Sequence, residues 1–177
     1  LTISAPLSIL VGAANSVLFP SMAEALGRGA EDAFRRQLHQ STEAIVVIMS
    51  GAIGLLMVLS SPVLALVWGD RFRAAEPLLP IMLGAILAYV TAVPSVSALV
   101  TRGAAQARIT TAFGIAGAMA GGVIWLLTAT SFGVIGVAWG YLISTVVSSG
   151  LTVLVAWRRE AQRWWGPMVR LLVIAAA

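Results

Sequence analysis

Charged residues are confined to short segments of this chain, and long uncharged blocks lie between them. Residues 1–23, 44–69, 77–101 and 109–157 contain no Asp, Glu, Lys or Arg. An α-helix crosses the hydrocarbon core of a bilayer, about 30 Å thick, in about 20 apolar residues. The first three blocks therefore match one crossing each, and the fourth is long enough for two. The pattern predicts an all-α fold, a polytopic transmembrane helical bundle.

We expect about five complete spans and the start of a sixth, all within a single membrane domain. Leu1 already lies inside an apolar segment, and the last apolar run is too short to cross. We therefore expect the chain to be an internal part of a longer protein. The predicted spans are residues 1–23, 44–67, 77–100, 109–127, 134–157 and, for the truncated one, 168–177.

The longest polar stretch, residues 24–43, precedes the second predicted span. Glu31 and Asp32 come four residues before Arg35 and Arg36, a spacing that favours ion pairs on an exposed helix. Apolar residues follow each other at four-residue steps on the opposite face. The stretch is therefore predicted to be an amphipathic helix that lies in the membrane interface.

Pro20 and Pro94 lie inside predicted spans, and each is expected to kink its helix. Proline removes a backbone donor and clashes with the preceding turn. Two interpretations remain open at both positions. Either the kinks are bending points for alternating access, or they reflect only the higher frequency of proline in membrane helices.

The composition narrows the chemistry that this chain can perform. Hydrophobic residues make up 59% of it and charged residues 10%, against about a quarter charged in soluble proteins. There is no cysteine and one histidine, His39, so thiolate and histidine-cluster metal sites are excluded and no cofactor is expected. The net charge of +4 comes from arginine, which in a membrane protein indicates topology, and no nucleic-acid partner is expected.

The arginines are divided unequally between the two sides of the predicted bundle. Segments 24–43, 101–108 and 158–170 carry nine, whereas segments 68–76 and 128–133 carry two. Under the positive-inside rule the arginine-rich side faces the cytoplasm. The loops predicted to be cytoplasmic are residues 24–43, 101–108 and 158–167.

Small residues recur at helical spacing in the last two complete spans. Gly117 and Gly121 form a GxxxG motif, and Gly136 and Gly140 begin a ladder that continues with serines. Such faces let helix backbones approach closely. We expect the fourth and fifth spans to pack as a hairpin, with sliding of these faces during transport as the alternative.

The spans offer few polar groups and no catalytic motif. Asn15 is the most polar residue deep in the first span, where it either lines an aqueous cavity or bonds to a neighbouring helix. No ionisable residue lies inside a span, so proton or sodium coupling has no candidate ligand. The chain has no P-loop, HExxH or GxSxG motif, which leaves ATP-driven transport and hydrolysis without support.

Three segments resemble signatures of polysaccharide flippases, which belong to the multidrug/oligosaccharidyl-lipid/polysaccharide exporter superfamily. Residues 17–25, VLFPSMAEA, resemble the "LFP-x-hydrophobic-small" signature of that family. Residues 67–78, VWGDRFRAAEPL, resemble its loop of glycine, aromatic, paired alanines and an apolar restart. Residues 132–140, FGVIGVAWG, resemble its turn. The three matches occur in order across most of the chain.

The resemblance implies the C-terminal half of a flippase with 12 or 14 spans in the bacterial inner membrane. Such proteins move undecaprenyl-pyrophosphate-linked sugar units to the outer leaflet by alternating access, for surface polysaccharide synthesis. Its partners would be the lipid-linked glycan, membrane lipids and the polysaccharide polymerase machinery. Family members usually hold positive charge in the cavity, yet no arginine lies mid-span here. The candidate headgroup-binding residues are therefore Arg28, Arg102 and Arg108 at the cytoplasmic mouth, with Asn15 inside the first span.

Other functions remain open alongside this one. Within the superfamily, the alternatives are a lipid II flippase or a multidrug exporter. From another class, a membrane-embedded polymerase or acyltransferase would need a polar catalytic cluster or a large outer loop, and the longest outer loop has about nine residues, 68–76. We therefore expect a transporter and no enzyme. A structural membrane subunit is the third alternative.

Overall fold

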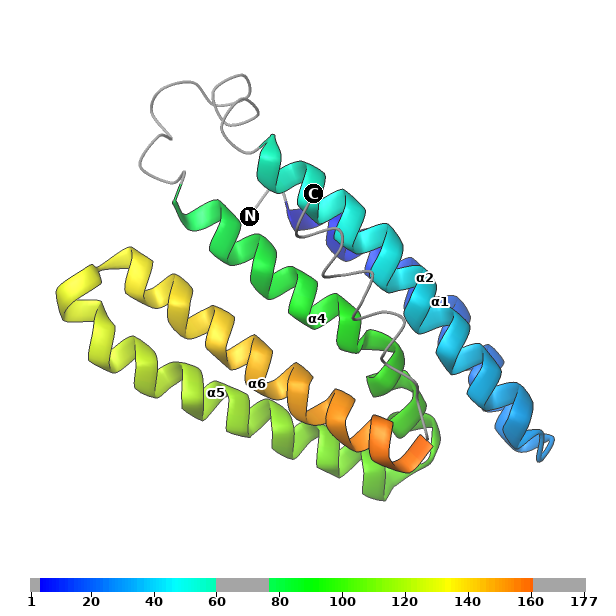
Figure 1. Ribbon diagram of the computed structural model, residues 1–177. Coiled ribbons are helices and arrows are strands. Elements are labelled where there is room, and N and C mark those ends of the chain that lie inside the picture. Colours follow the sequence, from blue (N-terminus) through cyan, green and yellow to red (C-terminus); the bar gives the residue numbers. More distant parts are fainter. Residues whose placement is uncertain (1–3, 60–76, 161–177) are drawn as a thin grey trace.

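The computed structural model describes residues 4–59 and 77–160, with the side chains of the first helix described from Ser16 onward. The described residues form an all-helical bundle (Figure 1). Its helices are α1 (Ser4–Gly27), α2 (Glu31–Val58), α4 (Leu78–Thr101), α5 (Ala104–Phe132) and α6 (Val134–Glu160).

Four of these helices, α2, α4, α5 and α6, are long and apolar enough to cross a membrane. This identifies the chain as a membrane protein with several transmembrane helices. The count of about five complete spans is not confirmed. The short run 168–177 and the loop 68–76 lie outside the described residues.

Helix α2 differs from the expectation of a separate interfacial helix. It runs without a break from Glu31 to Val58, so the charged stretch and the second span are one helix. The reason is a buried stripe, spaced by about one turn, that continues from the charged part into the apolar part. Its members are Phe34, Leu38, Thr42, Val46, Met49 and Ile53.

The other connections are shorter than the hydropathy pattern predicts. Only Arg102 and Gly103 separate α4 from α5, and only Gly133 separates α5 from α6. Helix α5 extends to Phe132 because its polar residues remain compatible with a helix. For example, the Thr128 hydroxyl donates to the Ile124 carbonyl one turn back, at 2.7 Å.

Helix α4 lies at the centre of the bundle, between α1 and α2 on one side and α6 on the other (Figure 1). A first apolar cluster joins α2 to α4 and contains Met49, Ile53, Leu83, Val90 and Val93. A second apolar cluster joins the end of α1, the start of α2 and the end of α4. Its buried members are Met22, Phe34, Leu38 and Ala98.

Helices α5 and α6 meet along a face of small residues, which we call the α5–α6 interface. A Cβ atom added at Gly121 would lie 2.6 Å from the Ser144 Cβ and would also meet the Gly140 carbonyl. One added at Gly117 would lie 2.8 Å from the Ser148 Cβ. The backbones are thus as close as glycine permits.

The same arrangement holds at the turn end of this interface. A Cβ added at Gly136 would lie 2.6 Å from the Thr128 hydroxyl oxygen, and one added at Gly140 would lie 2.8 Å from the Gly121 carbonyl oxygen. All four glycines of the sequence motifs therefore lie between α5 and α6. Sliding of these faces during transport stays a prediction.

Both span prolines lie inside continuous helices. Pro20 is within α1 and Pro94 is within α4, where it is buried. Neither proline ends its helix, and the kink expected at each stays a prediction.

Candidate functional site at the arginine-rich end

The arginines of the described residues lie toward one end of the bundle. The α1–α2 turn, the α4–α5 turn and the end of α6 come together there, opposite the α5–α6 turn (Figure 1). Those arginines are Arg28, Arg35, Arg36, Arg102, Arg108, Arg158 and Arg159. Three connections that are far apart in the chain thus present like charges to the same region.

Two glycines with positive φ shape this end. Gly29, with φ of 68°, ends α1 in a left-handed turn in which the Ala30 N–H donates to the Ala25 carbonyl at 3.0 Å. Gly103, with φ of 121°, lets α5 begin after a connection of only two residues, Arg102 and Gly103. The first turn places Glu31 at the start of α2. The second leaves Arg102 immediately after the C-terminal end of α4.

Arg102 binds two carboxylates from different helices. Its Nη1 and Nη2 donate to the Glu31 carboxylate at 2.6 and 2.8 Å. Its Nε and Nη2 donate to the Glu160 carboxylate at 3.0 and 2.6 Å. Each carboxylate therefore occupies one edge of the guanidinium in a bidentate pair, the strongest geometry for such contacts. The α4–α5 turn is tied in this way to both α2 and α6.

The guanidinium of Arg102 stacks over the ring of Phe34, with the guanidinium carbon 4.8 Å from the ring centroid. This is a cation–π distance. Phe34 belongs to the second apolar cluster and has no exposed surface. We call Arg102, Glu31, Glu160 and Phe34 the Arg102 cluster.

The two carboxylates differ in their exposure to solvent. The side chain of Glu160 is 5% exposed, that of Arg102 is 22% exposed and that of Glu31 is 46% exposed. Glu160 thus makes a nearly buried ion pair, whereas Glu31 makes a surface one. A buried carboxylate that lost its cation would pay a large desolvation cost, and a half-exposed one would be rehydrated.

The ion pairs shift the pKa values of the groups involved. Glu31 lies in the charged part of α2, ahead of its apolar stretch, and hydrogen bonds from Arg102 lower the pKa of its carboxyl. The same bonds and those to Glu160 raise the pKa of Arg102 above its usual value. The cluster therefore holds one cation and Glu31 as an anion at neutral pH.

The other candidate residues are not gathered at this cluster. Arg28 pairs with Glu24 one turn back, at 2.5 Å, and both side chains are mostly exposed. Arg108 is exposed on α5, with no ion pair among the described residues. Asn15 lies on α1, and its side chain is outside the described part of the structure.

Sequence reasoning identified Arg102 but missed both of its partners. Glu31 was predicted to pair with Arg35 on its own helix, and the structure directs its hydrogen bonds to Arg102 instead. Arg35 contributes only its positive potential at Glu31. The available signal was that Glu31, Arg102 and Glu160 each lie beside a predicted span on the same side of the membrane.

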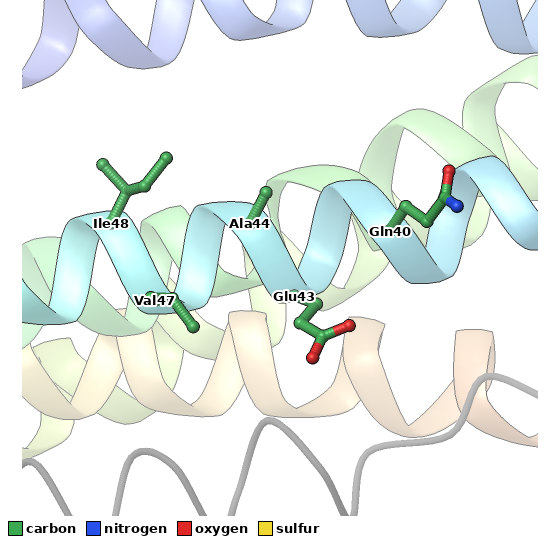
Figure 2. Close-up of a pocket in the computed structure, with 5 residues that line it drawn as sticks. All are labelled: Gln40, Glu43, Ala44, Val47 and Ile48. Atoms are coloured by element: carbon green, nitrogen blue, oxygen red, sulfur yellow. The ribbon is translucent and has the colours of Figure 1, made fainter.

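A shallow hollow of about 300 Å³ lies farther along α2 (Figure 2). Residues of this one helix line it, and Glu43 supplies its carboxylate. Figure 2 shows Glu43 and Val47 on one side of the helix and Ile48 on the other. The lining residues are Gln40, Glu43, Ala44, Val47 and Ile48. Among the residues that the structure describes, only this one helix contributes to the lining, so they form no convergent set of polar groups from several elements.

The chemistry of this end is electrostatic. Within residues 4–59 and 77–160, no three His, Asp or Glu side chains gather into a group suited to a metal ion. The Arg102 cluster holds the end of α4 to α2 and α6 through the hydrogen bonds of one guanidinium. Comparison of the chain with family models, curated proteins and solved structures found no match.

Proposed function

We propose that the chain is part of a flippase that moves undecaprenyl-pyrophosphate-linked oligosaccharide units to the outer leaflet by alternating access. It would do so in the bacterial inner membrane, with the arginine-rich end in the cytoplasm. It would contribute about five complete spans and the start of a sixth to a transporter of 12 or 14 spans. The sugar units would be used for surface polysaccharide synthesis, in association with the polymerase machinery.

The observation that carries this proposal is the Arg102 cluster at one end of a bundle whose apolar stretches contain no charge. An alternating-access transporter must close one end of its pathway while the other end is open. Hydrogen-bonded ion pairs between helices suit such a closure, because they are directional and become weak once water enters. The cluster joins α2 to α6 through the α4–α5 turn, and so crosses the end of the bundle.

The substrate class rests on the resemblance of residues 17–25, 67–78 and 132–140 to polysaccharide flippases. The bundle is compatible with it, because the faces of α5 and other helices present apolar side chains suited to lipid. The family orientation places the segment around Pro20 so that it descends toward the cytoplasm. The arginine distribution assigns that end to the same side.

Leaflet distribution of the substrate tests the proposal. Inactivation of the gene is expected to trap lipid-linked sugar units on the cytoplasmic leaflet, measured by their accessibility to an impermeant oxidant in oriented vesicles. Restoring the gene should return them to the outer leaflet. An unchanged distribution after inactivation would reject the flippase.

A further inference from the structure

Of the two ion pairs in the Arg102 cluster, the pair with Glu31 is easier to break than the pair with Glu160. Glu31 and Glu160 make equivalent bidentate contacts with the guanidinium, so distance does not distinguish them. Their exposure does, at 46% for Glu31 and 5% for Glu160. When the pair opens, Glu31 regains water at once, whereas Glu160 would be left as an uncompensated buried charge.

The edge of Arg102 that Glu31 occupies has the geometry of an oxyanion site. Its Nη1 and Nη2 N–H groups form a planar fork that fits phosphate oxygens as well as carboxylate oxygens. The pyrophosphate that links a lipid to its sugar carries a negative charge on each of its two phosphates, more than the single charge of a carboxylate. It is therefore able to compete with Glu31 for this edge.

The surroundings also favour an incoming anion at this position. Arg35, one turn along α2, adds positive potential where the Glu31 carboxylate now lies. Glu160 holds the Nε–Nη2 edge of the guanidinium, so the fork stays attached to α6 when Glu31 leaves. The site is at the end of the bundle where the arginines gather, within reach of headgroups at the membrane surface.

We infer that Arg102 is an anion-exchange site, at which a phosphate-bearing headgroup replaces Glu31 on the Nη1–Nη2 edge and frees the start of α2. Glu160 stays bound and keeps Arg102 attached to α6. The exchange rests on the proposed function for the identity of its natural ligand, a lipid pyrophosphate. Its geometry rests on the cluster alone. Arrival of the ligand would thus itself open the closed end.

A cysteine at Ala98, a buried residue next to the cluster, would detect this opening through its reactivity. Ala98 has no exposed surface and packs against Phe34 and Leu38, which belong to the start of α2. Because the chain has no cysteine, Ala98→Cys introduces a single thiol that reacts only when α2 moves away. Ala85→Cys is the matched control, since Ala85 is also fully buried on α4 but lies about five turns before Arg102.

The labelling rate of each cysteine variant by an impermeant maleimide is measured in three kinds of vesicle sample at equal ionic strength. The first contains phosphatidylcholine alone, the second adds phosphatidic acid, and the third adds inorganic pyrophosphate to phosphatidylcholine. Labelling at Ala98→Cys is expected to rise about fivefold with an anion, the factor that corresponds to losing one half-exposed ion pair. Labelling at Ala85→Cys should not change.

Variants of the two acidic neighbours separate exchange from general loosening. Glu31→Gln, combined with Ala98→Cys, should label about fivefold faster without any anion and gain little from one. Asp32→Asn, which alters the adjacent exposed carboxylate, should behave like the parent. A response to phosphatidic acid alone assigns the site to lipid headgroups, and a response to pyrophosphate alone assigns it to soluble phosphates.

Two results would overturn the inference. One is a labelling rate at Ala98→Cys that neither anion nor Glu31→Gln changes. The other is an equal increase when further sodium chloride is added to the phosphatidylcholine sample, which would indicate charge screening without a site. Either result leaves the flippase standing if inactivation of the gene still traps the substrate. Anion-driven opening with a normal leaflet distribution in the inactivated strain would reject the flippase and keep the exchange site.

Discussion

The α5–α6 interface and the Arg102 cluster hold the bundle together by opposite means. In the interface, Gly117 and Gly121 bring two backbones into contact along their length, with no charged group involved. In the cluster, long side chains from three helices meet at one point. The α5–α6 interface is rigid, because glycines and small side chains in close contact have few other conformations. The hydrogen bonds of the Arg102 cluster can rearrange, because its long side chains are flexible and partly hydrated.

Helices α4 and α5 also differ, in how much of each is buried inside the bundle. In the apolar stretch of α4, 56% of the residues are buried inside the bundle, against 11% for α5. Among the described helices, α5 therefore packs mainly on α6, through the glycines between them, with a smaller contact to α4. Helix α4 contacts helices on both sides, and its end carries Arg102. A movement of the bundle is therefore expected to keep α5 and α6 together and to change the contacts at the end of α4.

Substitution of a glycine in the α5–α6 interface should have the largest effect. Gly121→Leu forces a side chain against the Gly140 carbonyl and Ser144, and should lower the free energy of unfolding by about 3 kcal/mol. Gly122→Leu is the control, because a Cβ there meets no atom within 4 Å. Reversible unfolding in mixed detergent measures both. Equal losses at the two positions would show that the interface is not specific.

Removal of the cation at the Arg102 cluster should come next. Arg102→Ala leaves Glu160 nearly buried without its partner, and should lower the free energy of unfolding by about 2 kcal/mol. Arg108→Ala removes an exposed arginine near the start of the next helix, α5, and should change the free energy of unfolding by less than about 0.5 kcal/mol. If both arginines behaved alike in the same unfolding assay, the cluster would have no structural role.

Glu31→Gln should have a smaller and pH-dependent effect. The lowered pKa of Glu31 means that its ion pair stabilises the fold above the ordinary value of 4.5. This contribution is lost as the pH falls through the lowered pKa of the folded state. The parent should therefore be more stable than the variant at pH 7, by less than the loss in Arg102→Ala, and the difference should disappear in acid. This difference in stability is measured from unfolding curves of both proteins between about pH 3 and pH 7, a range that includes the ordinary pKa values of carboxyl groups. A difference that persisted unchanged in acid would contradict it.

The exposed pair of Arg28 and Glu24 should contribute least. Both side chains are mostly in solvent, so Arg28→Ala should change the free energy of unfolding by about 0.3–0.5 kcal/mol. The same unfolding assay applies, and added salt should remove the difference. If Arg28→Ala lowered the free energy of unfolding as much as Arg102→Ala, solvent exposure would not determine how much each ion pair at this end contributes to stability.

Much of the helical organisation was predictable from hydropathy, but the helix ends were not. The uncharged blocks located α4 and α6 to within a few residues. The four-residue steps placed Phe34 and Leu38 on one face, but the hydropathy pattern did not show that this face continues to Val46, so the charged start of α2 was separated from its span. The glycines that meet between α5 and α6 were recognisable because small residues at four-residue steps form one helix face.

The order and length of the apolar helices follow from local properties of the chain. A charge inside the bilayer is costly, and a helix satisfies its own backbone, so uncharged blocks become helices wherever they occur. The partners of Arg102 depend instead on contacts 71 and 58 residues apart. Nothing near Arg102 in the chain favours Glu31 over Asp32 or any other carboxylate. The choice is made only when α2, α4 and α6 pack together, because packing decides which carboxylates reach the guanidinium and which of them is buried.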